Sequence, residues 1–271
     1  MLANRILAGE LSASAAIGRP DLYFELSRNP FLGSSHKIEA GAGYGILSAV
    51  LYMQPAGVSG RESCPGRSAG CTAACLAESV GRMSMSGPQR ARRRRHAAFF
   101  SDRNSFLSDL SAEIARHARR AARQGKRPAV RLHGTTDLPW HRMRFIDADG
   151  QLWSSVHEAN PDVVFYEYTK TPLAVAARNL PPNLHLTFSL SDREDSDRRG
   201  LEYLDAGHNV AMVARIKRHA GPDTVVLGGK AWPTVDGDAH DARFLDPPGS
   251  VVLLAAKGRA KTDTTGFTRE V

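Results

Sequence analysis

The sequence predicts an α/β fold built on a parallel sheet. Short apolar runs rich in β-branched residues alternate with helical stretches along most of the chain. These runs are continuously apolar, as expected for strands of a parallel sheet that is covered by helices. Hydrophobic residues make up 42% of the 271 residues, which excludes a disordered chain and is enough to fill the core of one large domain. We expect a partial, TIM-like parallel (β/α) barrel, with an open doubly wound sheet as the alternative.

The expected strands and helices follow from the local pattern of apolar residues and from the residues that interrupt it. The expected strands are 46–53, 129–133, 163–166, 184–189, 210–214, 224–227 and 251–255. Helices are expected at 171–178, which has Pro172 near its first turn, and at 195–206. We divide the chain into an N-terminal extension, residues 1–35, and a single domain, residues 36–271.

No run approaches the roughly 20 apolar residues of a membrane span. Arg5 and Glu10 interrupt any apolar stretch that a signal peptide would need. We therefore expect a cytoplasmic protein with no membrane partner.

One segment accounts for the whole net positive charge of the chain. Residues 90–127 hold 12 Lys and Arg against 3 acidic residues, whereas the net charge of the chain is +8. The segment looks helical, with Phe106, Leu110 and Ile114 on one face and Asn104 or Ser105 as the cap. Two interpretations stay open: a solvated amphipathic helix pair, or a surface that binds the phosphates of a nucleic acid or an acidic host protein.

All three cysteines of the chain, Cys64, Cys71 and Cys75, lie in one twelve-residue stretch after the first expected strand. An odd, clustered count is no disulfide framework. Clustered thiolates favour a soft metal, and three suffice for a [4Fe–4S] cluster that leaves one iron open. Structural zinc would need a fourth ligand, for which no spacing gives a candidate. The remaining alternative is three buried apolar fillers.

Polar residues follow several expected strands at their carboxyl ends, where parallel α/β folds bind ligands. We expect Asp137 to move protons, Lys170 to contact an anion, and the hydroxyls of Thr135 and Ser189 to line the same pocket. Three of these residues also have a structural interpretation, because Asp137 or Thr135 could cap a helix and Lys170 could be a solvated lysine. The aspartates in 235–249 are interpreted as turn caps or as partners of a basic residue such as Arg243.

Several strings resemble the gene product 88 family of bacteriophages and prophages, over roughly residues 35–270: YMQPAGVSGRESCPGRSAGCTAACLAESVGRM, PAVRLHGTTDLPW, VFYEYTK, NLHLTFSLSD and VDGDAHDARFLDPPG. The resemblance implies a viral or mobile-element origin and a bacterial cytoplasm. It implies no activity.

A looser similarity is to radical S-adenosylmethionine enzymes, which place a three-cysteine [4Fe–4S] loop after the first strand of a full or partial barrel. Their usual spacing is Cys-x3-Cys-x2-Cys, whereas this chain has Cys-x6-Cys-x3-Cys. This similarity implies an architecture and a cluster, with S-adenosylmethionine as a candidate cofactor.

Two functions are therefore expected. The first is a phage-encoded iron–sulfur protein with an architecture like that of radical S-adenosylmethionine enzymes, whose open iron binds a small molecule or cofactor and whose reaction stays unassigned. The second is a non-catalytic phage accessory protein with a structural metal site and a basic face for nucleic acid or a host protein.

Overall fold

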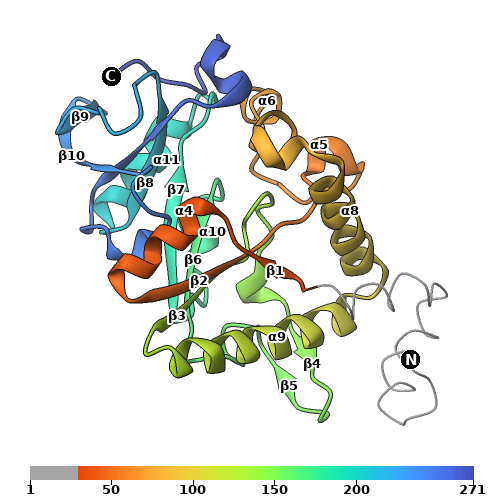
Figure 1. Cartoon of the computed structure of the whole chain (residues 1–271). Helices are drawn as coiled ribbons and strands as arrows, with labels where there is room; N and C mark the ends of the chain where they lie inside the picture. Colours follow the sequence, from red (N-terminus) through yellow and green to blue (C-terminus); the bar gives the residue numbers. More distant parts are fainter. Residues whose placement is uncertain (1–29) are drawn as a thin grey trace.

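The computed structural model describes residues 30–271. Its main feature is a sheet of nine strands, in the order β1-β2-β3-β6-β7-β8-β11-β10-β9 (Figure 1). The strands are β1 Leu32–Gly33, β2 Ile46–Leu51, β3 Arg127–Arg131, β6 Val164–Thr169, β7 Leu184–Ser189, β8 Asn209–Ala214, β9 Thr224–Leu227, β10 Lys230–Asp236 and β11 Val251–Ala255. A separate pair, β4 Phe145–Ile146 and β5 Leu152–Trp153, is antiparallel.

Helices and 3-10 turns connect the strands. The α-helices are α4 His36–Glu39, α5 Ala56–Ser59, α6 Ala69–Ala73, α7 Leu76–Ser79, α8 Ser86–Ser101, α9 Arg103–Arg123, α10 Leu173–Ala176 and α11 Ser196–Asp205. The 3-10 helices are η1 Ala40–Tyr44, η2 Gly81–Ser84, η3 Trp140–Arg142, η4 Arg243–Leu245 and η5 Gly258–Thr262.

Most strands of the sheet lie next to one another in the order in which they occur along the chain. The six strands β2, β3, β6, β7, β8 and β11 lie side by side in chain order, and each is parallel to its neighbours in this set. Their carboxyl ends therefore lie at one edge. The outermost pairs of the sheet, β1 with β2 and β9 with β10, are antiparallel.

The expected α/β fold with a parallel sheet is confirmed, but the TIM-like barrel is not shown. Within residues 30–271, β1 and β9 form the two ends of the sheet and do not pair with each other, so the sheet is not closed. The antiparallel hairpin of β9 and β10 extends one end. Gly228 and Gly229, both with positive φ, form its two-residue turn, as type I′ hairpins require.

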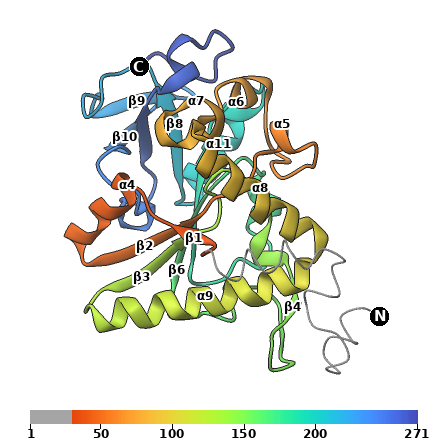
Figure 2. The same cartoon turned by 45° about the vertical axis from the view of Figure 1, so that its right-hand side comes forward.

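The two faces of the sheet differ in chemistry. Alternate side chains of each strand point to opposite faces, and one set belongs to the main hydrophobic core, for example Val130, Phe165 and Leu186. Helix α9 covers this apolar face with Phe106, Leu110 and Ile114, which are fully buried as their fourfold spacing predicts. Figures 1 and 2 both show α9 running beside β3, with α8 extending from its start towards α5 and α6.

The opposite face has a much smaller apolar cluster, which includes Ile46, Ala129 and Tyr166. Strand alternation places further polar side chains on this face: Ser48 on β2, Arg131 on β3, Tyr168 on β6, and Thr187 and Ser189 on β7. We call this the polar face. Helix α4 contacts β2 and turn η4 contacts β7.

Within the described residues, no helix combines the length and apolarity needed to cross a bilayer.

Candidate functional site

The three cysteines lie in the segment that follows β2, which we call the cysteine loop, residues 55–80. Cys64 lies in a turn, Cys71 in α6, and Cys75 at the start of α7. All three are free thiols and partly buried. The Cys64 thiol donates to the carbonyl of Thr135 at 3.8 Å, so it faces the loop that follows β3.

The cysteine loop packs against the carboxyl ends of the parallel strands. Gly66 lies so close to Lys170, just after β6, that an added Cβ would be 2.7 Å from the Cβ of Lys170. The backbone N–H of Asp137, after β3, donates to Ser63 O at 2.8 Å. The loop and the ends of β3 and β6 therefore form one continuous assembly.

A carboxylate after β7 holds the start of helix α6. Asp192 accepts the N–H of Gly70 at 3.0 Å and the hydroxyl of Ser68, and Ser68 in turn accepts the N–H of Cys71 at 3.1 Å. Burial would raise the pKa of Asp192, but these donors hold it below the usual value. A charged Asp192 thus fixes the turn that carries Cys71.

The thiols lie close enough to influence one another electrostatically. Burial raises the pKa of Cys75 to about 11, and charge on Cys71 and Cys64 contributes to the rise. Burial also raises the pKa of Cys64, with smaller contributions from the charges of Asp137 and Cys71. Among residues 30–271, however, no three or more His, Cys, Asp or Glu side chains are arranged as a ligand group for a metal ion.

The four other expected site residues surround this loop, and most of their polar atoms have structural partners. Asp137 Oδ2 accepts the backbone N–H of Lys170 at 2.9 Å. The Lys170 ammonium donates to Ser189 Oγ at 2.7 Å and to the carbonyls of Ser189 and Leu190. The hydroxyl of Thr135 donates to Met53 O. Thr135 therefore joins the segment after β3 to the end of β2, whereas Lys170 and Ser189 join the end of β6 to the end of β7.

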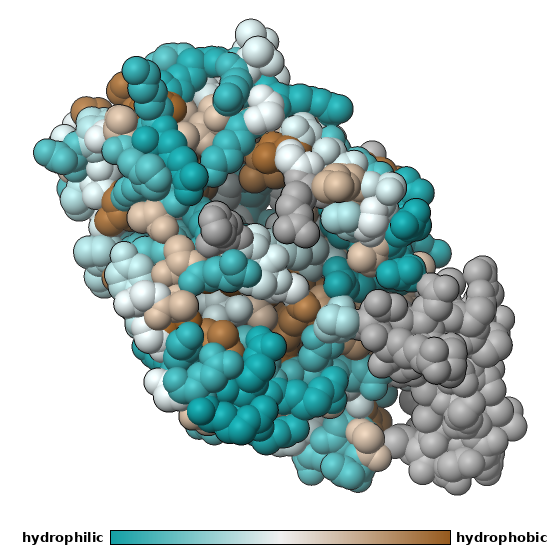
Figure 3. Space-filling model, viewed as in Figure 1, coloured by the Kyte–Doolittle hydropathy of each residue, from teal (hydrophilic) through white to brown (hydrophobic). Residues whose placement is uncertain are grey.

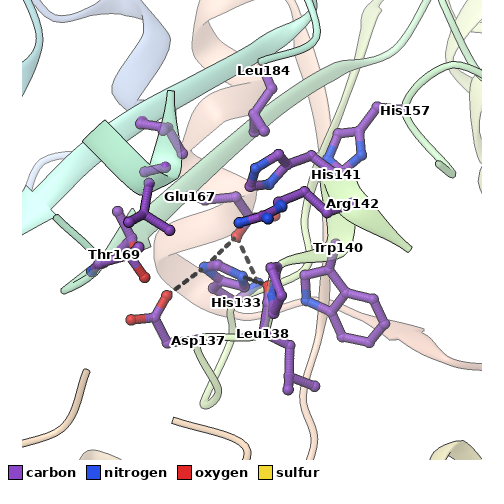
Figure 4. A pocket seen from close by; sticks show the side chains of 15 residues that line it. His133, Asp137, Leu138, Trp140, His141, Arg142, His157, Glu167, Thr169 and Leu184 are labelled. Atoms are coloured by element: carbon purple, nitrogen blue, oxygen red, sulfur yellow. Dashed lines mark hydrogen bonds and ion pairs between the residues drawn. The ribbon is translucent and has the colours of Figure 1, made fainter. Parts of the chain in front are cut away.

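His133 lies between the carboxylates of Asp137 and Glu167 (Figure 4). The two ring nitrogens of His133 lie 2.9 Å from Tyr168 O and 2.6 Å from Leu138 O, and carbonyl oxygens only accept. Both nitrogens are donors only in the protonated ring. Burial lowers the pKa of His133, but the charges of Glu167 and Asp137 and the two carbonyls raise it above its usual value overall.

Glu167 lies within β6 yet points its carboxylate at β3. It accepts the N–H groups of Leu132 and His133, both at 2.6 Å. Burial raises its pKa, while the charge of His133 and these two donors act in the opposite direction. The carboxylate thus takes the place of sheet hydrogen bonds at the end of β3.

Two further histidines line a cavity of about 30 Å³ next to this pair, on the apolar side of the sheet. Among residues 30–271, neither ring nitrogen of the fully buried His157 has a hydrogen-bond partner, and the buried Nε2 atom of His141 has none either. Burial lowers the pKa of His141 to about 4 and that of His157 well below its usual value. The cavity is large enough for one water molecule, and Figure 4 shows both rings on the same side of Glu167.

A second charged cluster lies on the polar face. Arg131 Nε is 2.9 Å from Asp241, which also accepts the hydroxyl of Tyr166 at 3.2 Å and lies 3.7 Å from the ammonium of Lys37. Burial would raise the pKa of Asp241, but Arg131 and Lys37 lower it. Burial lowers the pKa of Lys37 to about 8.

The interpretation of 235–249 as turn caps holds for Asp236, which accepts the N–H of Asp238 at 2.8 Å. Asp238 and Asp241 are instead buried partners of basic residues. Arg243, expected as such a partner, lies 3.3 Å from Asp246.

Sequence reasoning missed His133, Glu167, His141 and His157. One signal was present, since a glutamate inside the otherwise apolar run VVFYEYT needs a buried partner. His141 lies in the short 3-10 helix η3 and His157 in a turn. Neither segment has a periodic pattern, so only the folded chain brings these two histidines together.

These features define an open, singly wound α/β protein with a cysteine loop and a charged cluster at the carboxyl edge of its sheet. The chain belongs to the phage-associated gene product 88 family, whose family model matches residues 26–270. No curated protein and no solved structure matches it.

Proposed function

We propose that this protein is an iron–sulfur protein in which Cys64, Cys71 and Cys75 hold a [4Fe–4S] cluster and one iron stays open to a small molecule. The observation that carries the proposal is the position of the cysteine loop. Every cysteine of the chain lies on one loop packed on the carboxyl ends of β3, β6 and β7, beside Asp137.

The donor set fits a cluster better than a single zinc ion. Zinc binds its ligands at about 2.3 Å from sulfur in a compact tetrahedron, usually of four protein groups at structural sites. A cubane spreads its cysteines over separate iron atoms, so its thiolates are farther apart. Charge on Cys71 and Cys64 contributes to the raised pKa of Cys75, so the three sulfurs lie near one another. Three thiolates suffice for a [4Fe–4S] cluster with one open iron, whereas structural zinc takes four protein ligands.

The winding of the sheet supports the finer proposal of a radical S-adenosylmethionine type of architecture. Six parallel strands follow one another in chain order, as in a partial (β/α) barrel, and the cysteine loop comes directly after the first of them. By this analogy the open iron binds S-adenosylmethionine, which supplies the radical chemistry when bound. The polar face would then form the wall of the ligand site.

The chain's own residues have distinct roles in this proposal. Within residues 30–271, Asp137 Oδ1 accepts no hydrogen bond and lies 3.5 Å from His133 Nδ1, and Asp137 belongs to the same cluster of charges as Cys64. We therefore assign proton exchange with a ligand to Asp137, with His133 as its charged partner. The ammonium of Lys170 already makes three hydrogen bonds. We therefore assign Lys170, Thr135 and Ser189 to positioning the loop. For Lys170 to contact an anion, its ammonium would first have to break its hydrogen bonds to the end of β7.

Anaerobic purification followed by iron and sulfide analysis tests the cluster. We expect a brown protein with about four irons per chain, and loss of iron in Cys64→Ala, Cys71→Ala and Cys75→Ala. Ser84→Ala, an exposed change in the next turn, is the matched control and should keep its iron. A colourless protein that retains one zinc per chain would overturn the proposal.

Electron paramagnetic resonance of the reduced protein distinguishes an open from a closed cluster. Added S-adenosylmethionine should change the spectrum of an open iron, and reduced protein should cleave it. An unchanged spectrum and no cleavage, with the cluster intact, would leave the alternative: a non-catalytic accessory protein whose metal only holds the loop.

A further inference from the structure

The second half of α9 and the neighbouring edge of β2 enclose a groove of about 750 Å³. Arg116, Arg120, Arg123 and Lys126 line one wall, and α4 and the edge of β2 form the other side. Figure 3 shows hydrophilic surface over the lower part of the molecule, where α9 runs in Figure 1. We refer to this feature as the basic groove.

The cations of the basic groove are not neutralised by carboxylates of the described chain. None of the four forms an ion pair within residues 30–271, although the structure pairs many other arginines, such as Arg131 and Arg199. Two carboxylates, Glu39 and Glu113, also line the groove, so the four cations leave it with a net positive charge. The two oxygens of Glu113 accept the backbone N–H groups of Phe31 and Leu32. Four such cations at one groove repel one another, and an anion would relieve that repulsion.

The spacing of the arginines matches a linear polyanion. Positions 116, 120 and 123 recur at four and three residues, so they share one face of α9. At 1.5 Å per residue they span about 10 Å along the helix axis. This is the reach of two or three successive phosphates on one strand, and guanidinium groups bind phosphate through paired donors.

The chemistry of the groove favours nucleic acid over an acidic protein. Stable protein interfaces are centred on exposed apolar or aromatic anchors. Apolar residues that line this groove, such as Leu32, Ile38 and Ile46, are buried. The large exposed apolar residues of the described chain, such as Tyr44, Leu76, Met85 and Val226, do not line it. Nor does an exposed aromatic ring among the described lining residues offer a platform for stacking bases.

We propose that the basic groove binds the phosphodiester backbone of a nucleic acid without reading its sequence. This proposal is independent of the metal site, because the groove lies beside the outer edge of β2, whereas the cysteine loop lies at the carboxyl ends of the strands. The two sites would allow the protein to act while bound to a nucleic acid.

Fluorescence anisotropy with the full chain tests this inference. The probes are a labelled 12-nucleotide single strand of mixed sequence, its 12-base-pair duplex, and a labelled 12-residue polyglutamate peptide. Titrations at 50, 100 and 200 mM salt give the salt dependence of the binding constant. On a duplex, each phosphate that the protein neutralises contributes about −0.9 to the slope of the logarithm of the binding constant against the logarithm of the salt concentration.

The triple variant Arg116→Ala, Arg120→Ala, Arg123→Ala should bind at least about tenfold more weakly at 100 mM salt. On the duplex, the slope of the logarithm of its binding constant against the logarithm of the salt concentration should be smaller in magnitude by about two to three. The matched control is Arg178→Ala, Lys217→Ala, Arg259→Ala, which removes the same charge from other exposed positions. Circular dichroism establishes that both variants remain folded.

Three results would overturn the inference: no binding of either nucleic acid at 50 mM salt, equal losses in both triple variants, or polyglutamate binding as tightly as the nucleic acids. The comparison of single strand with duplex then identifies which form the groove prefers.

Discussion

Glu167 and His133 form a buried charge pair at the place where β3 and β6 separate. The His133 Nδ1 atom lies 3.6 Å from Glu167 Oε2, and the same carboxylate accepts the N–H groups of Leu132 and His133. β3 pairs with β6 only at Ala129 and Val130. Beyond that point a side chain replaces backbone pairing, and the histidine-lined cavity lies in the space that results.

The first prediction concerns the charge on His133. Its raised pKa means that the folded state gains stability from the protonated ring, which is present below the unfolded value near 6.5 and is lost as pH rises through the folded pKa. His133→Gln should lower the free energy of unfolding by about 3 kcal/mol at pH 6, because it leaves two buried carboxylates without their cation. Urea denaturation from pH 6 to 9 measures this.

The control for that prediction is His185→Gln, an exposed histidine, which should change stability by less than about 0.5 kcal/mol. If His133→Gln retains the alkaline loss of stability seen in the parent protein, the assignment of the charge to His133 is wrong.

The second prediction concerns His157, whose buried neutral ring must become charged on acidification. Its pKa lies below the unfolded value, so the folded state loses stability as pH falls below about 6.5. His157→Phe removes this loss, and the adjoining cavity of about 30 Å³ gives the larger ring room. Chemical denaturation at pH 7 and pH 5 should show a smaller acid loss in the variant, and equal losses would contradict the prediction.

The third prediction concerns the close approach of Gly66 to Lys170. A methyl group at residue 66 would lie 2.7 Å from Lys170 Cβ and 3.0 Å from its carbonyl carbon, so Gly66→Ala must push the cysteine loop off the sheet. Gly87→Ala in α8 is the control, because an added Cβ there would meet no described atom within 4 Å apart from its chain neighbours and its own helix backbone. We expect the first variant to unfold several degrees lower in thermal melts and to retain less iron, whereas the second should match the parent.

The fourth prediction concerns the hold of Asp192 on helix α6. Asp192→Asn replaces a charged acceptor of two hydrogen bonds by an amide, which should loosen the turn that carries Cys71 by about 1–2 kcal/mol. Timed alkylation of the metal-free protein, followed by mass spectrometry, should show Cys71 reacting several times faster. Glu194→Gln, an exposed neighbour, serves as the reference and should leave the rate unchanged.

Local pattern predicted seven of the eleven strands within residues 30–271 and the helices of the basic segment, but few of the short helices. The ranges 184–189, 224–227 and 251–255 coincide with β7, β9 and β11, and the cap of α9 differs only in being Asp102 rather than Asn104 or Ser105. Closure of the sheet was not predictable, because it depends on pairing between strands far apart in the sequence.

The site was predictable only in outline. Clustering of Cys64, Cys71 and Cys75 and their position after a strand were legible in the sequence. That Lys170 directs its donors to β7, and that Glu167 binds β3, depends on which strand ends become neighbours. The strand order β3-β6-β7 decides this, and no local pattern encodes it.

The short length of β1 affects the tendency of this protein to aggregate. β1 pairs with β2 only at Leu51 and Val50, so the first half of β2 has no strand partner on that side within residues 30–271, although its side chains are mostly buried. Such an unpaired rim can accept a strand of another chain and begin aggregation if its cover opens. The arginines of the basic groove stand beside this rim and give every copy the same positive sign there, so mutual repulsion acts as a gatekeeper. Neutralising these arginines should make the protein aggregate at high concentration.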